Sequence, residues 1–188
     1  GHPIVIDPVG VSGSSYRREK CLELMKIIHP TCIRGNYSEI QALLHNCGTV
    51  TGVDAAEDAL AEAEETDLPE LMKQYAKENQ MILVASGETD LITDGSCVYR
   101  CHNGSPMMAR ITGSGCMSTV MLGAFLSAEN SLESAVECCA FTGIAGELAA
   151  KEMTAQKRGT MTFRNWFIDA VSLMTPEQLE HGTDVDWF

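Results

Sequence analysis

The sequence predicts an α/β fold in which helices cover a mainly parallel sheet, with an antiparallel meander at one edge. Three observations support this prediction. Short apolar runs that are typical of strands alternate with amphipathic helical stripes along most of the chain. Two turn-forming dipeptides, Asp94-Gly95 and Asn103-Gly104, separate short strand-like runs. The 188 residues correspond to about one domain at ~150 residues per domain, and 45% are hydrophobic, enough for a packed core.

The charge balance excludes several classes of partner. Thirteen Lys and Arg stand against 26 Asp and Glu, so the formal net charge is −13. Binding to nucleic acid needs clustered basic residues, and docking on an anionic membrane surface needs them too. No apolar run approaches the ~20 residues of a membrane-spanning helix. We therefore predict a soluble, acidic, globular protein.

Strands and helices alternate in the first half of the chain. Ile4-Val5-Ile6 is apolar on both faces, as expected for a central parallel strand. A helix with Cys21, Leu24, Met25 and Ile28 on its buried side is predicted next, followed by a strand at 31–33. A second helix then has Ile40, Leu43, Leu44 and Cys47 on its buried side. Two more helices, from Asp54 to about Glu65 and from near Leu68, precede a strand at 81–85.

The period changes to that of strands after residue 90. The two turn dipeptides predict a meander of three short strands near 91–93, 97–102 and 107–111. Helices are predicted to resume at 115–128, 132–151 and 163–174. The last of these has an apolar stripe made of Phe163, Trp166, Phe167, Ala170, Val171 and Met174. The acidic tail after Pro176 is expected to be loosely held.

Eight cysteines, at positions 21, 32, 47, 97, 101, 116, 138 and 139, raise the question of disulfides or zinc. No CxxC spacing occurs, and the nearest approach to a metal motif, Cys97 with Cys101-His102, lies in a predicted strand. We expect mostly buried free thiols in a reducing cytosol. The acidic residues between 54 and 70 are interpreted as a solvated helix face rather than a surface for a cationic partner.

Four polar loops are each predicted to follow a strand. Open α/β sheets bind ligands at the carboxyl ends of their strands, so we expect these loops to share one site. Gly113, Ser114 and Gly115 would present backbone N–H groups to an anion at a helix N-terminus. Arg34 could bind phosphate oxygens, and Asp7 and Glu39 carry the hard oxygens that Mg²⁺ prefers. The four loops are Asp7 to Val11, Arg34 to Glu39, Ser86 to Asp90, and Thr112 to Cys116.

No Walker phosphate loop, GxxxxGK[ST], is present, so a kinase built on these loops must be of another class. Read in order, the four motifs resemble hydroxyethylthiazole kinase, a family of ribokinase-like fold that salvages the thiazole half of thiamine. The motifs are Asp-Pro-Val-Gly at 7–10, Ile-Arg-Gly-Asn-x-x-Glu at 33–39, Ser-Gly-Glu-x-Asp at 86–90 and Thr-Gly-Ser-Gly-Cys at 112–116, and the likeness runs from Pro3 to about Phe167.

The resemblance implies roles for individual residues. Arg34 and Asn36 of the second motif and Ser86 of the third correspond to the ATP-binding positions. Gly113 corresponds to a substrate contact, and Asp7 and Glu39 to the magnesium and phosphate carboxylates. Cys116 stands where most of the superfamily has a catalytic Asp, and with Gly113, Ser114 and Gly115 it forms the implied catalytic group. We expect the thiol mainly to orient the substrate hydroxyl.

The implied activity is ATP-dependent phosphorylation of the primary alcohol of 4-methyl-5-(2-hydroxyethyl)thiazole. The resemblance also implies Mg²⁺, a cytoplasmic location, and a homotrimer with active sites between subunits. Two alternatives remain open: a related kinase for a pyrimidine or sugar alcohol, and an inactive fragment that only binds nucleotide. A pyrimidine or sugar kinase of this superfamily would be expected to carry Asp at position 116.

Two departures from the family pattern accompany the resemblance. The family usually has Gly-Pro-Gly-Ser-Phe where this chain reads Gly159-Thr160-Met161-Thr162-Phe163. The family also carries a further segment before the position of Asp7, and this chain opens without Met in a strand-like run. We expect residues 1–188 to form a single domain that is the C-terminal two-thirds of a longer kinase domain.

Overall fold

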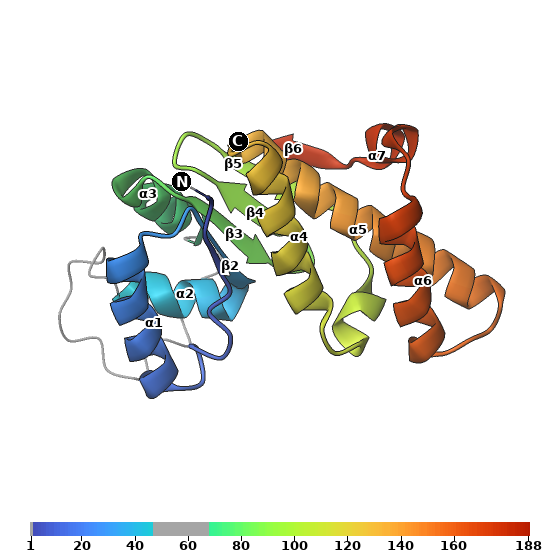
Figure 1. Ribbon diagram of the computed structural model, residues 1–188, viewed down its shortest axis with the longest axis horizontal. Coiled ribbons are helices and arrows are strands. Elements are labelled where there is room, and N and C mark those ends of the chain that lie inside the picture. The colour runs from blue at the N-terminus through green and yellow to red at the C-terminus, as the bar shows by residue number, and fades with distance from the viewer. Residues whose placement is uncertain (1, 47–67) are drawn as a thin grey trace.

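A computed structural model describes residues 2–46 and 68–188 of the chain (Figure 1). Within them, one six-stranded sheet has the order β1-β2-β3-β4-β5-β6. The first three strands are parallel to one another, and the remaining neighbours are antiparallel, so the sheet is mixed. The strands are β1 (Val5–Ile6), β2 (Cys32–Asn36), β3 (Ile82–Ser86), β4 (Asp90–Thr93), β5 (Val98–Cys101) and β6 (Val185–Trp187).

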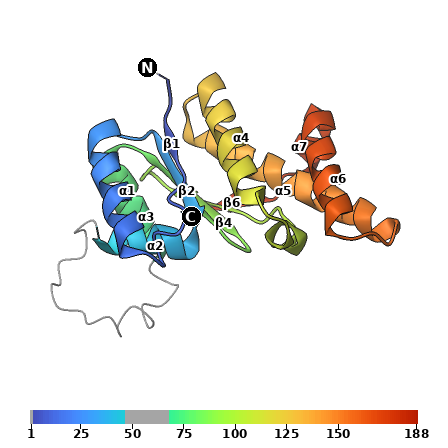
Figure 2. The ribbon, with the colours of Figure 1, turned by 60° about the horizontal axis from the view of Figure 1, so that its bottom comes forward.

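Helices cover both faces of this sheet, which confirms the predicted α/β class (Figure 2). One layer contains α1 (Ser15–Ile28), α2 (Tyr37–Asn46) and α3 (Leu68–Asn79), and the other contains α4 (Ser114–Ala128) and α5 (Leu132–Ala155). Beyond α5 lie α6 (Thr160–Leu173) and α7 (Pro176–Gly182), and a short 3₁₀ helix, η3 (Pro106–Arg110), precedes α4.

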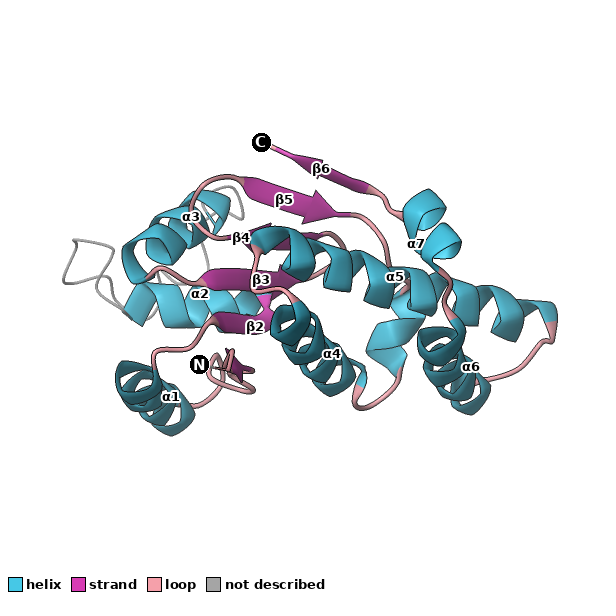
Figure 3. Cartoon of the chain, turned by 45° about the horizontal axis from the view of Figure 1, so that its top comes forward, coloured by secondary structure: helices cyan, strands magenta, loops and turns pink. Residues whose placement is uncertain are grey.

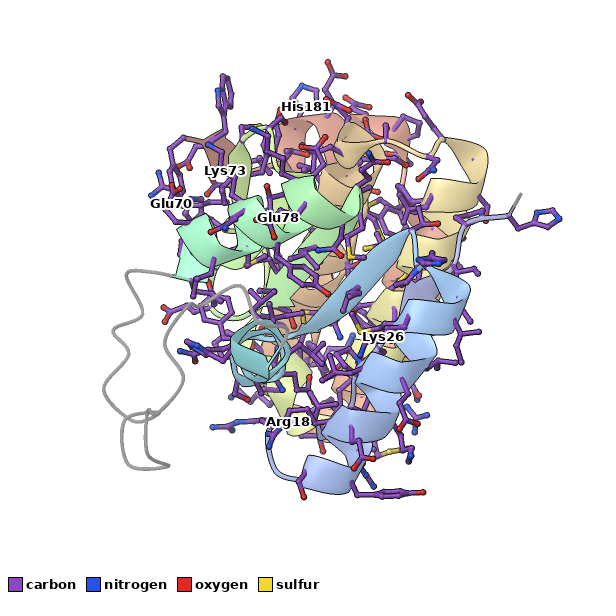
Figure 4. The ribbon with its side chains drawn as sticks, turned by 90° about the vertical axis from the view of Figure 1, so that its left-hand side faces the viewer. Arg18, Lys26, Glu70, Lys73, Glu78 and His181 are labelled. Atoms are coloured by element: carbon purple, nitrogen blue, oxygen red, sulfur yellow. The ribbon has the colours of Figure 1, made fainter. Side chains whose placement is uncertain are left out.

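The two-residue period of the strands explains the two layers. Ile33 and Leu83 pack into the cluster beneath α1, α2 and α3, whereas Cys32 and Ile82, one residue earlier, pack against α4 and α5. Strands buried on both faces read as continuous apolar runs in the sequence. In Figure 4, which looks onto the first layer, charged side chains of α1 and α3 such as Lys26 and Glu78 lie on its outer surface.

The stripe predicted for the last long helix is confirmed. Phe163 and Phe167 of α6 are fully buried, with ring centroids 6.3 Å apart. They form a smaller core with Ala145 and Ala149 of α5, and the other stripe residues pack around it. Gly159 precedes α6 as its N-cap, so the segment 159–163, which departs from the family pattern, leads directly into a helix.

Strand β1 is parallel to β2, as predicted, and among the described residues it pairs with β2 alone. One prediction about the first 30 residues is wrong. Leu24 does not join the buried side of α1, since it is 47% exposed, and Met25 with Cys21 and Leu22 makes the packing contacts instead. The periodicity of a helix does not show how much of its apolar face neighbouring elements will cover.

The predicted meander is only half right. Strands β4 and β5 form the expected hairpin across Asp94-Gly95. The third run, 107–111, is not a strand, because residues 106–110 form η3 and Asn103-Gly104 is not a hairpin turn. The strand that pairs with β5 is β6 at the end of the chain, so the tail after Pro176 is not loose but forms α7 and β6 (Figure 3).

Some predictions fall outside the described residues. These are the helix from Asp54 to Glu65, most of the acidic cluster, and Cys47. Helix α2, before that segment, agrees with its predicted stripe, since Ile40, Leu43 and Leu44 are buried. Helix α3, after it, starts at Leu68 as predicted. Among the described helices, none combines the length and the apolar character that crossing a membrane requires.

Candidate active site

All of the predicted site residues line one cleft of about 1000 Å³ at the carboxyl ends of β1, β2 and β3. The structure corrects two of the four predicted loops. The second predicted loop, 34–39, is not a loop, since Arg34 to Asn36 end β2 and Tyr37 begins α2 at once. The fourth predicted loop, 112–116, follows η3 rather than a strand. The predicted residues in the cleft are Asp7, Arg34, Asn36, Glu39, Ser86, Gly113, Ser114, Gly115 and Cys116.

Arg34 reaches across the cleft to the start of α4. Its Nη1 donates to the Gly115 carbonyl oxygen at 3.2 Å, which joins residues 81 positions apart in the chain. In the described part of the chain no carboxylate lies within ion-pair distance of this half-buried guanidinium. Its remaining N–H groups are therefore available to an anion in the cleft.

The N-terminus of α4 faces the same space. Gly113 is its N-cap and provides no side chain to satisfy the first-turn amides. The backbone of Gly113 has a φ of +97°, a conformation that favours glycine, and a Cβ built there would meet no atom within 4 Å. Ser114 Oγ donates to the Met108 carbonyl oxygen at 2.8 Å and so fixes the loop to η3. Free amides, a helix dipole and Arg34 together create an anion site.

Asn36 and Glu39 cap α2 reciprocally. The Glu39 N–H donates to Asn36 Oδ1 at 2.9 Å, and the Asn36 N–H donates to Glu39 Oε2 at 3.0 Å. The other Glu39 oxygen, Oε1, accepts the Gly10 N–H at 2.8 Å and ties the first loop to the second. The Asn-x-x-Glu spacing of this pair is a capping-box signal in the sequence. These two residues therefore shape the cleft as well as line it.

Asp7 is held beside the first turn of α4. The Thr119 hydroxyl, one turn into α4, donates to Asp7 Oδ2 at 2.8 Å. Ser86, the last residue of β3, donates through Oγ to the Gly35 carbonyl oxygen at 3.2 Å. Among the residues that the structure describes, no three His, Cys, Asp or Glu gather into a metal site made by protein alone. The carboxylates of Asp7 and Glu39 are two hard-oxygen donors in the same cleft.

Asp90 is the acid in the cleft whose environment is most unusual. Burial raises the pKa of its carboxyl to about 6, although the Gly87 N–H, 3.0 Å from Oδ1, and the charge of Arg34 both act in the opposite direction. At neutral pH the folded protein therefore holds a carboxylate that burial disfavours. A group of this kind stabilises the fold below its unfolded pKa, and that contribution is lost as the pH rises through the folded pKa.

We expect Asp90→Asn to raise the thermal unfolding temperature at pH 8 and to leave it unchanged near pH 4. The Asn carboxamide oxygen can still accept the Gly87 N–H, so the substitution removes the charge and keeps this hydrogen bond. Unfolding curves from pH 4 to pH 8, with exposed Asp94→Asn as the control, measure the difference between variant and wild type. A difference that does not grow as the pH passes about 6 would contradict the raised pKa of Asp90.

Comparison with known proteins places this cleft in a family. The model of the hydroxyethylthiazole kinase family matches residues 1–177. The chain belongs to the hydroxyethylthiazole kinase family. Curated relatives agree: hydroxyethylthiazole kinase 1 of Methanosphaera stadtmanae is 39% identical, over 90% of this chain and 62% of the relative. Hydroxyethylthiazole kinase of Clostridium acetobutylicum is 35% identical, over 95% of this chain and 66% of the relative.

A solved structure supports the fold of the family. The hydroxyethylthiazole kinase protein from Pyrococcus horikoshii OT3 superposes with a TM-score of 0.81 at 26% identity, covering 99% of this chain and 65% of that one. The motifs implied a ribokinase-like α/β fold. This superposition confirms that the chain has the α/β fold of a hydroxyethylthiazole kinase. The chain spans about two thirds of the length of the relatives that it matches.

Sequence reasoning missed one wall of the cleft in this hydroxyethylthiazole kinase family member. That wall consists of residues 102–106 with Met108 and Ala109, and of Cys138, Cys139, Thr142 and Gly143 from α5. A Cβ on Gly143 would lie 2.5 Å from the Asn103 carbonyl oxygen, so a glycine is required where α5 meets this segment. An isolated glycine in a helical stripe was the available signal for this close approach.

The cysteines agree with the expectation of free thiols. Every described cysteine is free, and Cys32, Cys101, Cys138 and Cys139 are buried. Burial raises the pKa of the Cys32 thiol above its ordinary range and that of Cys138 to about 12, so both stay protonated. Cys116, in contrast, is exposed at the start of α4, where it lines the cleft.

Proposed function

We propose that this chain carries the phosphotransfer site of an ATP-dependent kinase that phosphorylates the primary alcohol of 4-methyl-5-(2-hydroxyethyl)thiazole in thiamine salvage. One observation supports this more than any other. A guanidinium with no carboxylate partner in the described chain, that of Arg34, lies at the uncapped N-terminus of α4 in the main cleft. A site of this kind favours a polyanion such as the phosphates of ATP. We assign the thiazole alcohol as the phosphate acceptor because the chain belongs to the hydroxyethylthiazole kinase family.

In this proposal the protein acts mainly by positioning and electrostatics. Arg34, Asn36 and Ser86 bind the ATP phosphates, and the amides of residues 113–116 hold the transferring phosphoryl group as charge develops on it. Gly113 also contacts the alcohol. Asp7 and Glu39 would hold Mg²⁺ together with waters and phosphate oxygens, and the ion would neutralise charge on the phosphates. The two carboxylates fit this role because both are hard-oxygen donors that line the same cleft.

Cys116 orients the substrate hydroxyl in this scheme. A loose transition state needs little early removal of the hydroxyl proton, so a strong base at this position is not required. We expect Cys116→Ala to lower kcat by at most ~10²-fold, the low end for loss of a general base. Cys116→Asp should remain active. Steady-state kcat with saturating ATP and thiazole alcohol measures both, with Cys97→Ala, which lies outside the cleft, as the control. A loss of ~10⁴-fold in the Ala variant would instead make the thiol an essential base.

The assembly is part of the proposal. We propose a homotrimer in the cytoplasm with active sites between subunits, as the resemblance implies. Sedimentation equilibrium of the chain, with and without ATP, measures its oligomeric state. A monomer that is fully active would remove the requirement for a neighbouring subunit.

The activity itself is tested by ADP release with the thiazole alcohol, with a pyrimidine alcohol and with no alcohol. We expect turnover only with the thiazole alcohol, and phosphate on the alcohol by mass spectrometry. Equal turnover with the pyrimidine alcohol would favour a related kinase. If calorimetry shows ATP binding but neither alcohol is turned over, the chain is a nucleotide-binding module rather than an active kinase.

A further inference from the structure

The last seven residues of the chain are built onto the wall of the cleft. They lie beyond residues 1–177, to which the family model corresponds. Strand β6 pairs with β5, with Tyr99 opposite Trp187 and Cys101 opposite Val185. The pairing continues past both strands, since the His102 N–H donates to the Asp184 carbonyl oxygen at 2.9 Å. No residue of 182–188 lines the cleft itself.

Asn103 connects this segment to the interior of the cleft. Its side chain is buried, and the residue lines the cleft. Nδ2 donates to the Gly182 carbonyl oxygen at 2.8 Å and to Glu147 Oε1 at 3.1 Å, while Oδ1 accepts the Asp184 N–H at 2.8 Å. The carboxamide is thus anchored by α5 on one side and by the C-terminal segment on the other. Glu147 also accepts the next backbone N–H, that of Gly104, at 2.8 Å.

His102 connects the same segment to the loop at 86–90. Its ring lies between Thr89 Oγ1, 3.3 Å from Nδ1, and Asp186 Oδ2, 3.2 Å from Nε2. Asp186 Oδ1 accepts from Arg100 Nε at 2.6 Å, and the hydrogen bond from Arg100, with that from His102, lowers the pKa of this carboxyl. The Arg100 guanidinium in turn lies 5.1 Å from the ring centre of Phe188. A continuous set of contacts therefore runs from the end of the chain to Thr89.

We infer that residues 182–188 form a clasp that positions the nucleotide side of the cleft. Through Asp186 and His102 the clasp fixes the loop at 86–90, and through Gly182, Asp184 and Asn103 it fixes the wall at 102–104. Asp186 is then a positioning residue, because it acts on the site only through other groups. The identity of the ligand as ATP rests on the proposed function, whereas the clasp itself does not.

The expected effect is local and small in energy. Asp186 and His102 are partly exposed, with side chains 49% and 35% accessible, so their contacts add little to global stability. Loss of the Asp186 carboxylate should release the 86–90 loop. Exposed pairs of this kind typically change an equilibrium by up to about 5-fold, and we expect local opening of the loop to increase by about 2- to 5-fold.

The test measures amide hydrogen exchange of residues 86–90 in the nucleotide-free chain, for wild type, Asp186→Ala and Asp186→Glu. Glu180→Gln is the matched control, because it removes one exposed carboxylate from α7 without touching the clasp. We expect about 2- to 5-fold faster exchange in Asp186→Ala, partial recovery in Asp186→Glu, and wild-type exchange in Glu180→Gln. Calorimetry should give an ATP Kd for Asp186→Ala that is weaker by a similar factor.

Unchanged exchange at 86–90 in Asp186→Ala, or the same acceleration in Glu180→Gln, would overturn the clasp. The two inferences fail separately. If wild type binds no ATP but its exchange responds to Asp186→Ala, the proposed function fails and the clasp stands. If wild type binds ATP and Asp186→Ala leaves both exchange and Kd unchanged, the clasp fails and the proposed function stands.

Discussion

Replacing Gly113 by valine is expected to reduce phosphoryl transfer by at least ~10²-fold, the scale for losing one donor to a developing anion. The Cβ would meet no protein atom within 4 Å, so the new side chain would fill open space in the cleft, where we propose that the phosphoryl group contacts the backbone. The φ of +97° adds strain to any substitution, which would turn the first-turn amides away from the anion. kcat with saturating ATP and thiazole alcohol is the measurement.

Gly159→Val is the matched control for this change. Gly159 is also the N-cap of a helix, α6, and also has no atom within 4 Å of a built Cβ, but its φ is −105° and it lies outside the cleft. We expect its activity to stay near that of wild type. Thermal unfolding of both variants separates the two explanations for Gly113. A Gly113→Val protein that no longer folds would assign this glycine to chain geometry alone.

Removing the guanidinium of Arg34 is expected to weaken ATP binding by about 1–3 kcal/mol, which is roughly 5- to 150-fold in Kd, the range for a charge-assisted hydrogen bond. Arg34→Ala also removes one donor from the Gly115 carbonyl oxygen, which still accepts from the Thr119 hydroxyl at 3.1 Å. Arg34→Lys keeps the charge but lacks the planar fork, so it should recover only part of the affinity. Calorimetric titration with ATP measures all three proteins.

The control for Arg34 is Arg110→Ala, which removes one positive charge from an exposed position on η3 outside the cleft. Its ATP Kd should equal that of wild type. An unchanged Kd in Arg34→Ala would remove this residue from the nucleotide site. A loss of equal size in Arg110→Ala would point to the overall charge of the protein rather than to a contact.

Local patterns were sufficient for much of the fold. The helices α2, α3, α4, α5 and α6 appear close to their predicted ranges. For α2 and α6, the predicted apolar stripe is the face that packs on neighbouring elements. The site residues at the ends of β1, β2 and β3 gather in one cleft because parallel strands place their carboxyl ends at the same edge. Both results follow from rules that act over a few residues or over one sheet.

The sequence by itself determined the α/β class, the approximate positions of the long helices and nine of the residues that share the cleft. The tertiary structure alone decided which strand completes the sheet, since β6 pairs with β5 across more than 80 intervening residues. It also decided that Arg34 bonds Gly115 and that Asn103 is an anchor rather than a turn. Pairings between distant segments depend on which surfaces remain uncovered after the chain has packed, and no local period records that.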